Sequence, residues 1–270
     1  MKHESRNTIH EIRIREFFDL YWKRKRLRRW DDMRHLARSL KDEAYSKVPI
    51  ESPSKILEIG PGMGQDTKFL AREGREVYAI DISREGINRA RDQIPNFNSQ
   101  TPIKFQSPIS NIKTNFHFPL TNLQFVQMDA HRMGFKEESF DLLFGNTVLM
   151  HLHRGKFFPE AHRVLKVGGR AVFIEPLRFN PFLLFYRFLL SESRKIRPRY
   201  LSPQEIPRLS SFFQNVRSRE SHLLSIVFIP LLSTKSQFVF QLFFSMDEIL
   251  LKLFPFLKGY CAFTVIECVK

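Results

Sequence analysis

The chain has 270 residues, 43% of them hydrophobic, which is enough for one domain with a sizeable buried core. Its formal net charge is +15, and its two cysteines, Cys261 and Cys268, are too few for a disulfide framework and lack His or Cys partners at metal-binding spacing. Residues 1–15 are polar and charged, which does not support a secretory signal, so we expect a reducing, cytoplasmic compartment.

Positive charge is concentrated on two flanks of the chain. Residues 1–50 hold 14 basic and 8 acidic residues and residues 178–220 hold 9 and 3, whereas residues 51–177 hold 16 and 14. Such flanks can attract an anionic substrate, RNA or anionic lipid headgroups. A solvated basic surface without a specific partner explains the same distribution equally well.

The first fifty residues are predicted to form an N-terminal helical arm. Over residues 8–43 apolar side chains recur at roughly helical spacing without Pro or Gly, and a basic run at 23–29 interrupts the stripe. Two helices or one bent helix are therefore expected. For the aromatic residues Phe17, Tyr21 and Trp22, core packing is the favoured role.

Residues 55–70 are predicted to form a strand, a glycine turn and a helix. An apolar strand that contains Glu58 is followed by Gly60, Gly62 and Gly64 at alternate positions. Glycines suit a turn that needs positive φ and that lets a ligand approach the backbone at the carboxyl end of a strand. The spacing differs from the G-x-G-x-x-G of dinucleotide-binding proteins, and the charge of Glu58 favours a cationic ligand over a pyrophosphate.

The motif formed by Glu58, Gly60, Gly62 and Gly64 resembles the first motif of the class I methyltransferases that use S-adenosylmethionine (SAM). The resemblance implies a Rossmann-like, doubly wound α/β fold whose seven-stranded sheet is mostly parallel with an antiparallel last strand and carries helices on both faces. It also implies that SAM lies against the glycine backbone and that Glu58 contributes to the surroundings of its amino group. In related methyltransferases an N-terminal helical segment is often a lid, which would bring aromatic residues of the arm near the cofactor.

Residues 76–83 are predicted to be the second strand, with Asp81 at its carboxyl end. A carboxylate at that position can accept hydrogen bonds from both hydroxyls of a ribose. By the resemblance, Asp81 is the ribose-binding acid and Ile82 packs on the adenine face. The alternative is that Asp81 merely caps the helix expected at 83–93.

Residues 95–120 are rich in Pro, Asn, Ser and Thr, have no stable period and are expected to be an insertion, to which the sequence assigns no role. Strand character returns at 123–127. By the resemblance, Asp129 accepts a hydrogen bond from the adenine amino group, and the backbone amide of Ala130 meets a ring nitrogen.

The next predicted strand covers residues 140–147 and ends near Asn146, which is a further candidate cofactor contact because carboxyl strand ends face the ligand crevice. The segment that follows resembles an apolar-His segment of ubiquinone and menaquinone biosynthesis methyltransferases. His151 is therefore the candidate for a general base or for orienting the substrate nucleophile. A role of His151 or His153 in capping helix contacts agrees with the sequence equally well.

A helix is expected over 156–169, ended by two glycines, and a strand over 170–176. The run from Glu160 to Arg170, E-x-x-R-V-L-K-x-G-G-R, is characteristic of small-molecule class I methyltransferases. Together with the glycine turn it identifies the expected fold.

The SAM-binding core is placed at residues 51–177, followed by a C-terminal part of the same domain, residues 178–270, with a substrate-side insertion and closing strands. Two stretches there, residues 177–190 and 223–244, are strongly apolar. The first suits a hydrophobic acceptor or contact with a membrane surface, although neither stretch is expected to span a bilayer. Burial as a helix or strand is the favoured interpretation.

The sequence therefore predicts a SAM-dependent methyltransferase that acts on a small, lipophilic acceptor without a metal, in the cytoplasm or peripheral to the membrane. The alternatives are an RNA methyltransferase that uses the basic flanks and a protein that binds SAM without catalysis. An NAD-dependent dehydrogenase conflicts with the glycine spacing. Methylation of the amino groups of DNA or RNA bases is disfavoured because no N-P-P-Y or D-P-P-Y sequence follows the fourth strand. Both cysteines are expected in the last strand, which disfavours a cysteine nucleophile for methylation of a pyrimidine carbon.

Overall fold

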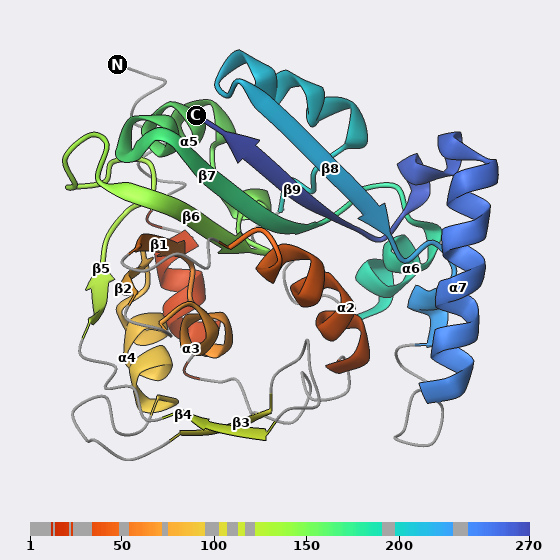
Figure 1. Ribbon diagram of the computed structural model, residues 1–270, viewed down its shortest axis with the longest axis horizontal. Helices are drawn as coiled ribbons and strands as arrows, with labels where there is room; N and C mark the ends of the chain where they lie inside the picture. The colour runs from red at the N-terminus through yellow and green to blue at the C-terminus, as the bar shows by residue number, and fades with distance from the viewer. Residues whose placement is uncertain are drawn as a thin grey trace.

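The computed structural model describes residues 12, 14–21, 23, 34–48, 54–71, 75–94, 103–106, 113–116, 122–190, 198–228 and 237–270. These residues form a seven-stranded sheet with helices packed around it (Figure 1). None of the helices in the described part of the chain has the length and apolar character needed to cross a membrane.

The sheet has the strand order β5-β2-β1-β6-β7-β9-β8. Its strands are β1 (Lys55–Ile59), β2 (Glu76–Asp81), β5 (Leu123–Gln127), β6 (Phe140–Asn146), β7 (Leu165–Pro176), β8 (Asn215–Ser221) and β9 (Phe263–Val269). The first five in spatial order run parallel, and β9 is antiparallel to both of its neighbours. The expected Rossmann-like sheet with an antiparallel last strand is confirmed.

Helices and short 3-10 turns connect these strands. The α-helices are α2 (Arg34–Tyr45), α3 (Gln65–Leu70), α4 (Arg84–Asp92), α5 (Arg154–Val164), α6 (Pro181–Leu190) and α7 (Gln237–Leu253). The 3-10 turns are η3 (Leu149–His151), η5 (Pro203–Glu205), η6 (Pro207–Ser211), η7 (Ser225–Phe228) and η8 (Pro255–Tyr260).

The central parallel strands β1 and β6 are buried on both faces, so their sequences are almost continuously apolar, whereas the edge strand β5 exposes Gln124 and Gln127. Because successive side chains of a strand point to opposite faces, one strand contributes side chains to two cores. In β6, Leu143 packs with α5 in one core, whereas Leu142 and Phe144 pack with α2 and α3 in the other. This double burial holds the sheet between its helices and fixes the edge at which the strands end.

The two glycines expected to end a helix at residue 169 lie in a strand instead. Helix α5 already ends at Val164, and Leu165 pairs with Phe140 as the first residue of β7. The pairing then shifts register, with Gly168 at φ 74°. A side chain on Gly169 would come within 2.8 Å of a backbone oxygen, so the glycines serve an irregular strand start rather than a helix cap.

The insertion at 95–120 contains regular structure that its sequence did not indicate. Strands β3 (Ile103–Gln106) and β4 (Lys113–Phe116) pair as an antiparallel hairpin, separate from the main sheet. The remaining residues of this insertion lie outside the described part of the chain.

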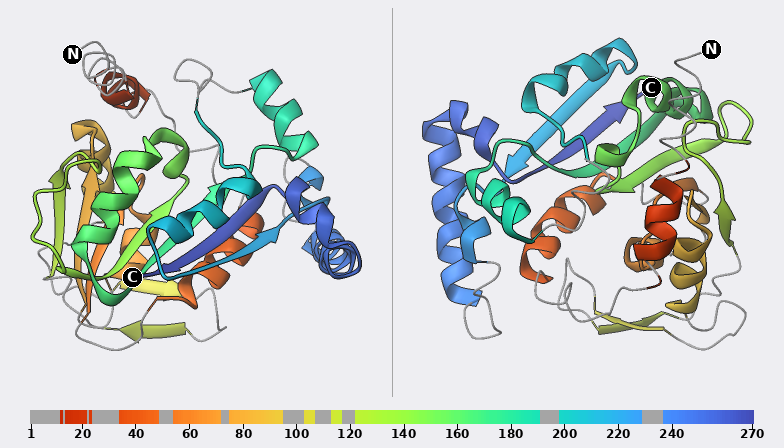
Figure 2. Two further views of the ribbon diagram at one scale, coloured as in Figure 1. Left: turned by 90° about the horizontal axis from the view of Figure 1, so that it is seen from above. Right: turned by 180° about the vertical axis from the view of Figure 1, so that it is seen from behind.

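The N-terminal arm contains two helical pieces in different places. Helical residues 14–21 lie apart from α2 in both views of Figure 2, although the two pieces are near in sequence. Helix α2 packs against β7 and β9 through the core that contains Leu40 and Ala44. Trp22 and most of the basic run lie outside the described residues.

Candidate active site

The sheet gathers the predicted site residues at one edge. Glu58 lies beside Ala79 and Phe144 in the register of the sheet, and Asp81 closes the pairing of β2 with β5. Asn146 is the last residue of β6 and pairs with β7. Since parallel strands end on the same side, this carboxyl edge is where a ligand crevice is expected in such a sheet.

The glycine turn after β1 has the conformation that its sequence predicts. Gly60, Gly62 and Gly64 have φ values of 68°, 59° and 70°, in the left-handed region that side chains disfavour. The amide of Gly60 donates to the carbonyl of Ile80 at 2.8 Å, and a side chain on Gly64 would lie 3.1 Å from the carbonyl of Ala90. The turn therefore brings bare backbone to the carboxyl edge while packing closely on α4.

Glu58 is a buried carboxylate without a full set of partners. Its side chain is only 2% exposed, and Oε2 has no hydrogen-bond partner among the described residues. Burial raises the pKa of Glu58 to about 8, the charge of Asp66 adds to the rise, and Lys41 opposes it. A cation beside this oxygen would relieve the cost of burying the charge, so the site fits the ammonium group of an amino-acid moiety.

Asp66, which sequence analysis did not single out, ties three elements together beside Glu58. Its Oδ1 accepts from the Tyr45 hydroxyl at 2.5 Å and pairs with Lys41 Nζ at 2.6 Å, and its Oδ2 accepts from Asn146 Nδ2 at 3.0 Å. Helices α2 and α3 are thereby joined to the end of β6. The available sequence signal was an acid in the first turn of a helix that follows a glycine turn.

Asp81 lies at the end of β2, where it is expected to bind ribose. Its Oδ1 accepts from the Ser83 amide at 2.8 Å. Burial raises the pKa of Asp81 to about 6, and the nearby charge of Asp19 adds to the rise. The cap of α4 is Ser83, whose hydroxyl accepts from the Gly86 amide at 3.0 Å, so the alternative in which Asp81 merely caps this helix is wrong. Ile82 lies next to Asp81, with its carbonyl accepting from Gln127 at 3.2 Å.

Asp129 is part of a hydrogen-bond relay that runs through His131 to the His153 amide. Its Oδ1 accepts from the His131 amide at 2.9 Å and lies 2.7 Å from His131 Nδ1. Since the His153 amide donates to His131 Nε2 at 2.9 Å, the ring proton belongs on Nδ1 and points at Asp129. Burial acts to raise the pKa of Asp129, but the His131 hydrogen bonds outweigh it and keep that pKa below its ordinary value. Ala130, the expected adenine contact, is buried beside this relay.

Glu175, at the end of β7, fixes the turn that carries His151. Its Oε1 accepts from the amides of Val148 and Leu149, each at 2.8 Å. The side chain is fully buried, Oε2 has no partner among the described residues, and burial raises its pKa to about 7 against the lowering effect of the two amides. Thr147 before this turn has φ 58°, a strained backbone for a β-branched residue at a strand end. The sequence signal for Glu175 was an acid within the apolar run 171–176.

His151 lies in η3 with its ring edge-on to Phe18, at a centroid distance of 5.0 Å. Burial lowers the pKa of His151 to about 4, so its imidazole is neutral at pH 7. His153 occupies the N-cap position of α5 but makes no capping hydrogen bond with its side chain. The capping interpretation is therefore wrong for His153.

The N-terminal helical residues lie across the carboxyl edge, between the His151 ring and Ser83 at the start of α4. Phe18 contacts His151, and Asp19 accepts from the Ser83 hydroxyl at 2.5 Å. The sequence named Phe17 and Tyr21 as aromatic residues of interest, but these stack on each other at 6.0 Å. Among the described residues of this segment, Phe18 contacts the His151 ring at the site.

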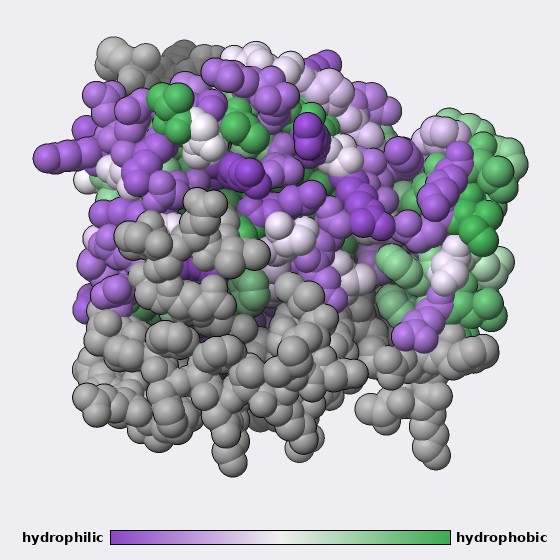
Figure 3. Space-filling model, in the orientation of Figure 1, coloured by the Kyte–Doolittle hydropathy of each residue, from purple (hydrophilic) through white to green (hydrophobic). Residues whose placement is uncertain are grey.

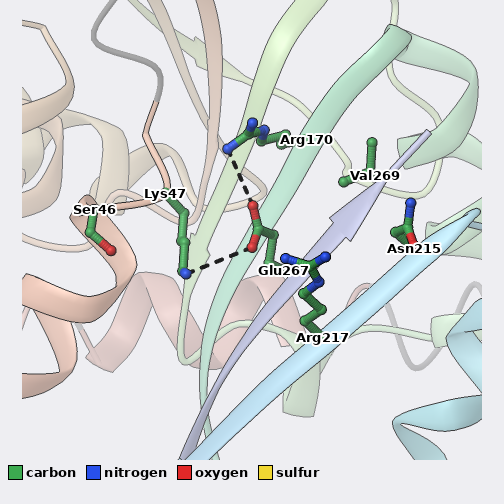
Figure 4. Close-up of a pocket in the computed structure, with 7 residues that line it drawn as sticks. All are labelled: Ser46, Lys47, Arg170, Asn215, Arg217, Glu267 and Val269. Carbon is green, nitrogen blue, oxygen red and sulfur yellow. Dashed lines mark hydrogen bonds and ion pairs between the residues drawn. The ribbon is translucent and has the colours of Figure 1, made fainter.

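A hollow of about 360 Å³ lies at the opposite edge of the sheet, where the parallel strands begin. It is lined by Ser46, Lys47, Arg170, Asn215, Arg217, Glu267 and Val269. Figure 4 shows Glu267 between Lys47, at 3.9 Å, and Arg170, at 3.3 Å. This hollow is not part of the candidate active site, because none of the predicted site residues lines it.

The two cysteines are not part of the candidate active site, and the described residues form no metal-binding cluster there. Cys268 lies in β9, whereas Cys261 precedes that strand, which corrects the expectation that both belong to it. Both thiols are free and buried, and burial raises the pKa of each to about 12. Within the described ranges no group of three or more His, Cys, Asp or Glu side chains is arranged to hold a metal ion.

Comparison with known proteins agrees with this fold. Residues 57–173 match the family described as "Methyltransferase domain". The chain is 29% identical over 159 residues to a demethylmenaquinone methyltransferase of Tropheryma whipplei, covering 57% of this chain and 56% of that protein. It is 22% identical over 142 residues to the methyltransferase GfsG of Streptomyces halstedii, covering 52% and 44% of the two chains.

A solved structure shares the fold across most of the chain. Geranyl diphosphate C-methyltransferase from Streptomyces coelicolor superposes with a TM-score of 0.54 at 15% identity, covering 87% of this chain and 80% of that one. Residues 57–173 thus match a methyltransferase domain, and the fold around them is that of the class I methyltransferases, whose cofactor is SAM, as the glycine motif predicted. It spans about half the length of the curated relatives it matches.

Proposed function

We propose that the protein is an enzyme that transfers a methyl group from SAM to a small, lipophilic acceptor. The observation that carries the proposal is the buried, unpartnered oxygen of Glu58 beside a glycine turn, at the carboxyl edge of a methyltransferase sheet. A dehydrogenase cofactor would bring phosphates to this turn, and their negative charge would oppose ionisation of the buried Glu58, whereas a cation would favour it.

The methionine end of SAM is assigned to the glycine turn. Glu58 supplies negative charge for the ammonium group, and Gly60, Gly62 and Gly64 leave the backbone accessible to the ligand. Asn146 lies next to this position, but its Nδ2 is held by Asp66 and its Oδ1 accepts from the Thr147 hydroxyl at 3.0 Å. These two hydrogen bonds therefore hold the Asn146 side-chain amide in one orientation beside the methionine end of SAM.

The nucleoside end is assigned to the ends of β2 and β5. Asp81 accepts from the ribose hydroxyls, and Ile82 covers one face of the adenine. Asp129 uses Oδ1 for its two contacts with His131, so Oδ2 is the atom that accepts from the adenine amino group. The backbone amide of Ala130 meets a ring nitrogen.

The chemistry requires mainly alignment from the protein. Bound SAM supplies a methyl group on a cationic sulfur that leaves neutral. Because the displacement is in line, holding the acceptor in position provides much of the rate. His151 is neutral at pH 7 and so able to accept a proton, although its low pKa suits an acidic acceptor group or an orienting hydrogen bond better than a strongly basic role. Glu175 is a positioning residue, since it holds the turn that presents His151.

A lipophilic acceptor is supported by the apolar surroundings of His151 and of the end of β7. Phe18 packs on the His151 ring, and the aromatic helix α6 begins five residues after β7 ends at Pro176. One protein similar to this chain is named for a lipophilic compound, demethylmenaquinone, and another for geranyl diphosphate, in which an apolar chain carries a charged diphosphate.

The proposal is tested by incubating the protein with methyl-labelled SAM and with separate lipid, metabolite and RNA fractions. Label that appears in an organic-soluble small molecule supports the proposal. Label in RNA, bound in a strongly salt-dependent way, would replace it with the RNA methyltransferase. SAM binding without transfer to any fraction would make the protein a SAM-binding protein without catalysis.

A further inference from the structure

Helix α7 carries an apolar stripe on its exposed side. Leu242, Met246, Ile249 and Leu253 follow the spacing of one helix face and are between 41% and 66% exposed. The opposite face is buried through residues such as Phe240 and Leu251. A helix on a protein surface ordinarily has polar residues on its outer face, so this second stripe lacks a partner.

The buried face locks α7 so that the exposed stripe cannot rotate inward. Asp247 is 1% exposed and accepts from the Leu224 amide at 2.8 Å and from the Ser225 amide and hydroxyl at 3.1 and 2.7 Å. Turning the helix would break three hydrogen bonds to a buried carboxylate. The outward direction of the stripe is therefore part of the folded structure.

Helix α6, like α7, has apolar side chains on its exposed side and turns a charged side chain toward the protein. Its apolar residues Phe182, Leu184, Phe185 and Phe188 are between 41% and 71% exposed. Its single cation, Arg187, instead turns toward the protein, donates to the Leu177 carbonyl at 3.0 Å and lies 3.5 Å from the centre of the Tyr200 ring. The helix turns its charge partly inward and exposes these four hydrophobic side chains, for which the expected burial of residues 177–190 is wrong.

Buried Asn180 connects α6 to the elements around α7. Its Nδ2 donates to the carbonyls of Tyr260 and Leu223, at 2.8 and 3.2 Å, while its Oδ1 accepts from the Leu183 amide at 3.0 Å. The turn η8 follows α7, and in it Phe256 and Tyr260 are 70% and 51% exposed. We call the exposed apolar residues of α6, α7 and η8 the α6–α7 surface.

The α6–α7 surface gathers at one end of the molecule. Figure 3 shows apolar surface concentrated over α7 and beside it, whereas the rest of the coloured surface in that view is predominantly polar. Single exposed hydrophobic residues are ordinary, but a set contributed by three neighbouring elements indicates an interaction site.

The charges around this surface identify its partner. Arg178, Lys252 and Lys258 are exposed and form no ion pair with the described residues. The acidic residues of α7 are already used, since Asp247 is buried and Glu248 pairs with Arg219 at 3.2 Å. The free charge beside the apolar residues is therefore positive. Two copies of the chain meeting through this surface would bring these cations together, which disfavours self-association.

We propose that the α6–α7 surface docks the protein on an anionic lipid bilayer. Its aromatic and aliphatic side chains enter the boundary between headgroups and acyl chains, while lysines and arginines at its rim contact anionic headgroups. Helix α6 begins five residues after β7 ends. Docking through α6 would therefore bring the carboxyl edge of the sheet near the bilayer, in which a lipophilic acceptor dissolves. The inference does not depend on methyl transfer, because it concerns a surface outside the active site.

The test is co-sedimentation of the full chain, without SAM or acceptor, with vesicles of phosphatidylcholine that contain either no anionic lipid or about one third phosphatidylglycerol. We expect binding to the anionic vesicles that weakens in about 0.5 M NaCl. A triple variant, Ile249→Gln, Leu253→Gln and Phe256→Gln, is expected to lower the partition coefficient about tenfold or more. Val167→Gln, which alters an exposed apolar residue at the start of β7, is the matched control and should bind as the wild type does.

A charge variant keeps the proposal testable if the apolar variant folds poorly. Lys252→Glu with Lys258→Glu should lower binding about tenfold or more, whereas Arg91→Glu with Lys136→Glu changes the net charge equally on exposed residues elsewhere and should have a much smaller effect. Equal losses in the two charge variants, or no binding by the wild type, would overturn the proposal. A wild-type dimer in light scattering that dissociates in the apolar variant and does not sediment with vesicles would overturn it in favour of a second copy.

Discussion

The carboxyl edge of the sheet and the α6–α7 surface depart from ordinary protein structure in opposite ways. At the edge, Glu58 and Glu175 are buried with an oxygen that finds no partner among the described residues. At the α6–α7 surface, hydrophobic side chains are exposed while Arg187 and Asp247 point inward. Each region is locked by a buried polar residue, Asp66 in one and Asn180 in the other.

This contrast shows two kinds of incomplete surface with different partners. A buried carboxylate that lacks a partner is satisfied by a small cation, which a crevice at the sheet edge can surround. An apolar face is satisfied only by another apolar phase or surface, because no small ligand covers several turns of helix. The following predictions separate these two regions experimentally.

The largest effect is expected from His151→Ala. Loss of a positioned base or orienting group should lower turnover by about 100-fold or more, without changing SAM affinity. Because burial lowers the pKa of His151 to about 4, the part of the rate that depends on its neutral form should be constant above about pH 6. The measurement is steady-state turnover from pH 5 to 8, with His153→Ala as the control. Full activity in His151→Ala removes this residue from the mechanism.

Asn180→Ala should test whether the α6–α7 surface is locked independently of the active site. Removal of its amide leaves buried backbone groups unsatisfied, so we expect a loss of about 2 to 3 kcal/mol in the free energy of unfolding. SAM affinity should stay unchanged, because the partners of Asn180 lie beside β8 and β9, at the end of the sheet away from the strands β1 and β2 that carry Glu58 and Asp81. Urea unfolding followed by circular dichroism measures the loss, and Asn88→Ala, at an exposed position of α4, serves as control. A large loss of SAM affinity in the folded variant would show that the two regions are coupled.

Asp81→Ala should weaken SAM binding by about 1 to 3 kcal/mol through the loss of charge-assisted hydrogen bonds to ribose. Isothermal titration calorimetry measures this change, and Asp92→Ala, an exposed acid at the end of α4, should bind SAM normally. An unchanged dissociation constant in Asp81→Ala would refute the ribose assignment.

Glu58→Gln should remove a pH dependence of SAM binding. In the free protein the pKa of Glu58 is about 8, and a bound cation lowers it, so affinity should rise with pH toward 8, by at most about tenfold per pH unit, and then level off. The same raised pKa means that Glu58 stabilises the free fold fully below its unfolded pKa, and that this contribution is lost as pH rises through about 8.

Calorimetry between pH 6 and 8.5 checks the binding effect, and thermal unfolding without SAM checks the stability effect. Glu58→Gln should reduce the pH dependence of both profiles and leave the part of the stability profile that Glu175, with its pKa of about 7, contributes, whereas Glu137→Gln, at an exposed position, should leave both as in the wild type. A wild-type affinity that does not vary with pH would rule out the coupling of Glu58 to a cationic ligand.

Local pattern was sufficient to predict the strand and turn framework. Near-continuous apolar runs predicted β1, β2, β5 and β6, because strands buried on both faces need hydrophobic residues on both. The glycine spacing predicted a positive-φ turn, since φ above zero is nearly exclusive to glycine. Family resemblance then supplied the number of strands and the antiparallel last strand, whereas the strand order came from the structure, because single-strand patterns cannot encode it.

The sequence by itself determined the class of domain, the glycine turn and the strand ends that carry Glu58, Asp81 and Asn146, because these depend on neighbouring residues and short periods. Only the tertiary structure decided which groups meet across the chain: Asp66 with Lys41 and Tyr45, Glu175 with the His151 turn, and Phe18 with His151 itself. It also decided that α6 is exposed, since apolar composition predicts a preference for burial but not whether the fold provides a partner. Contacts between distant segments depend on packing, and packing is a property of the whole chain.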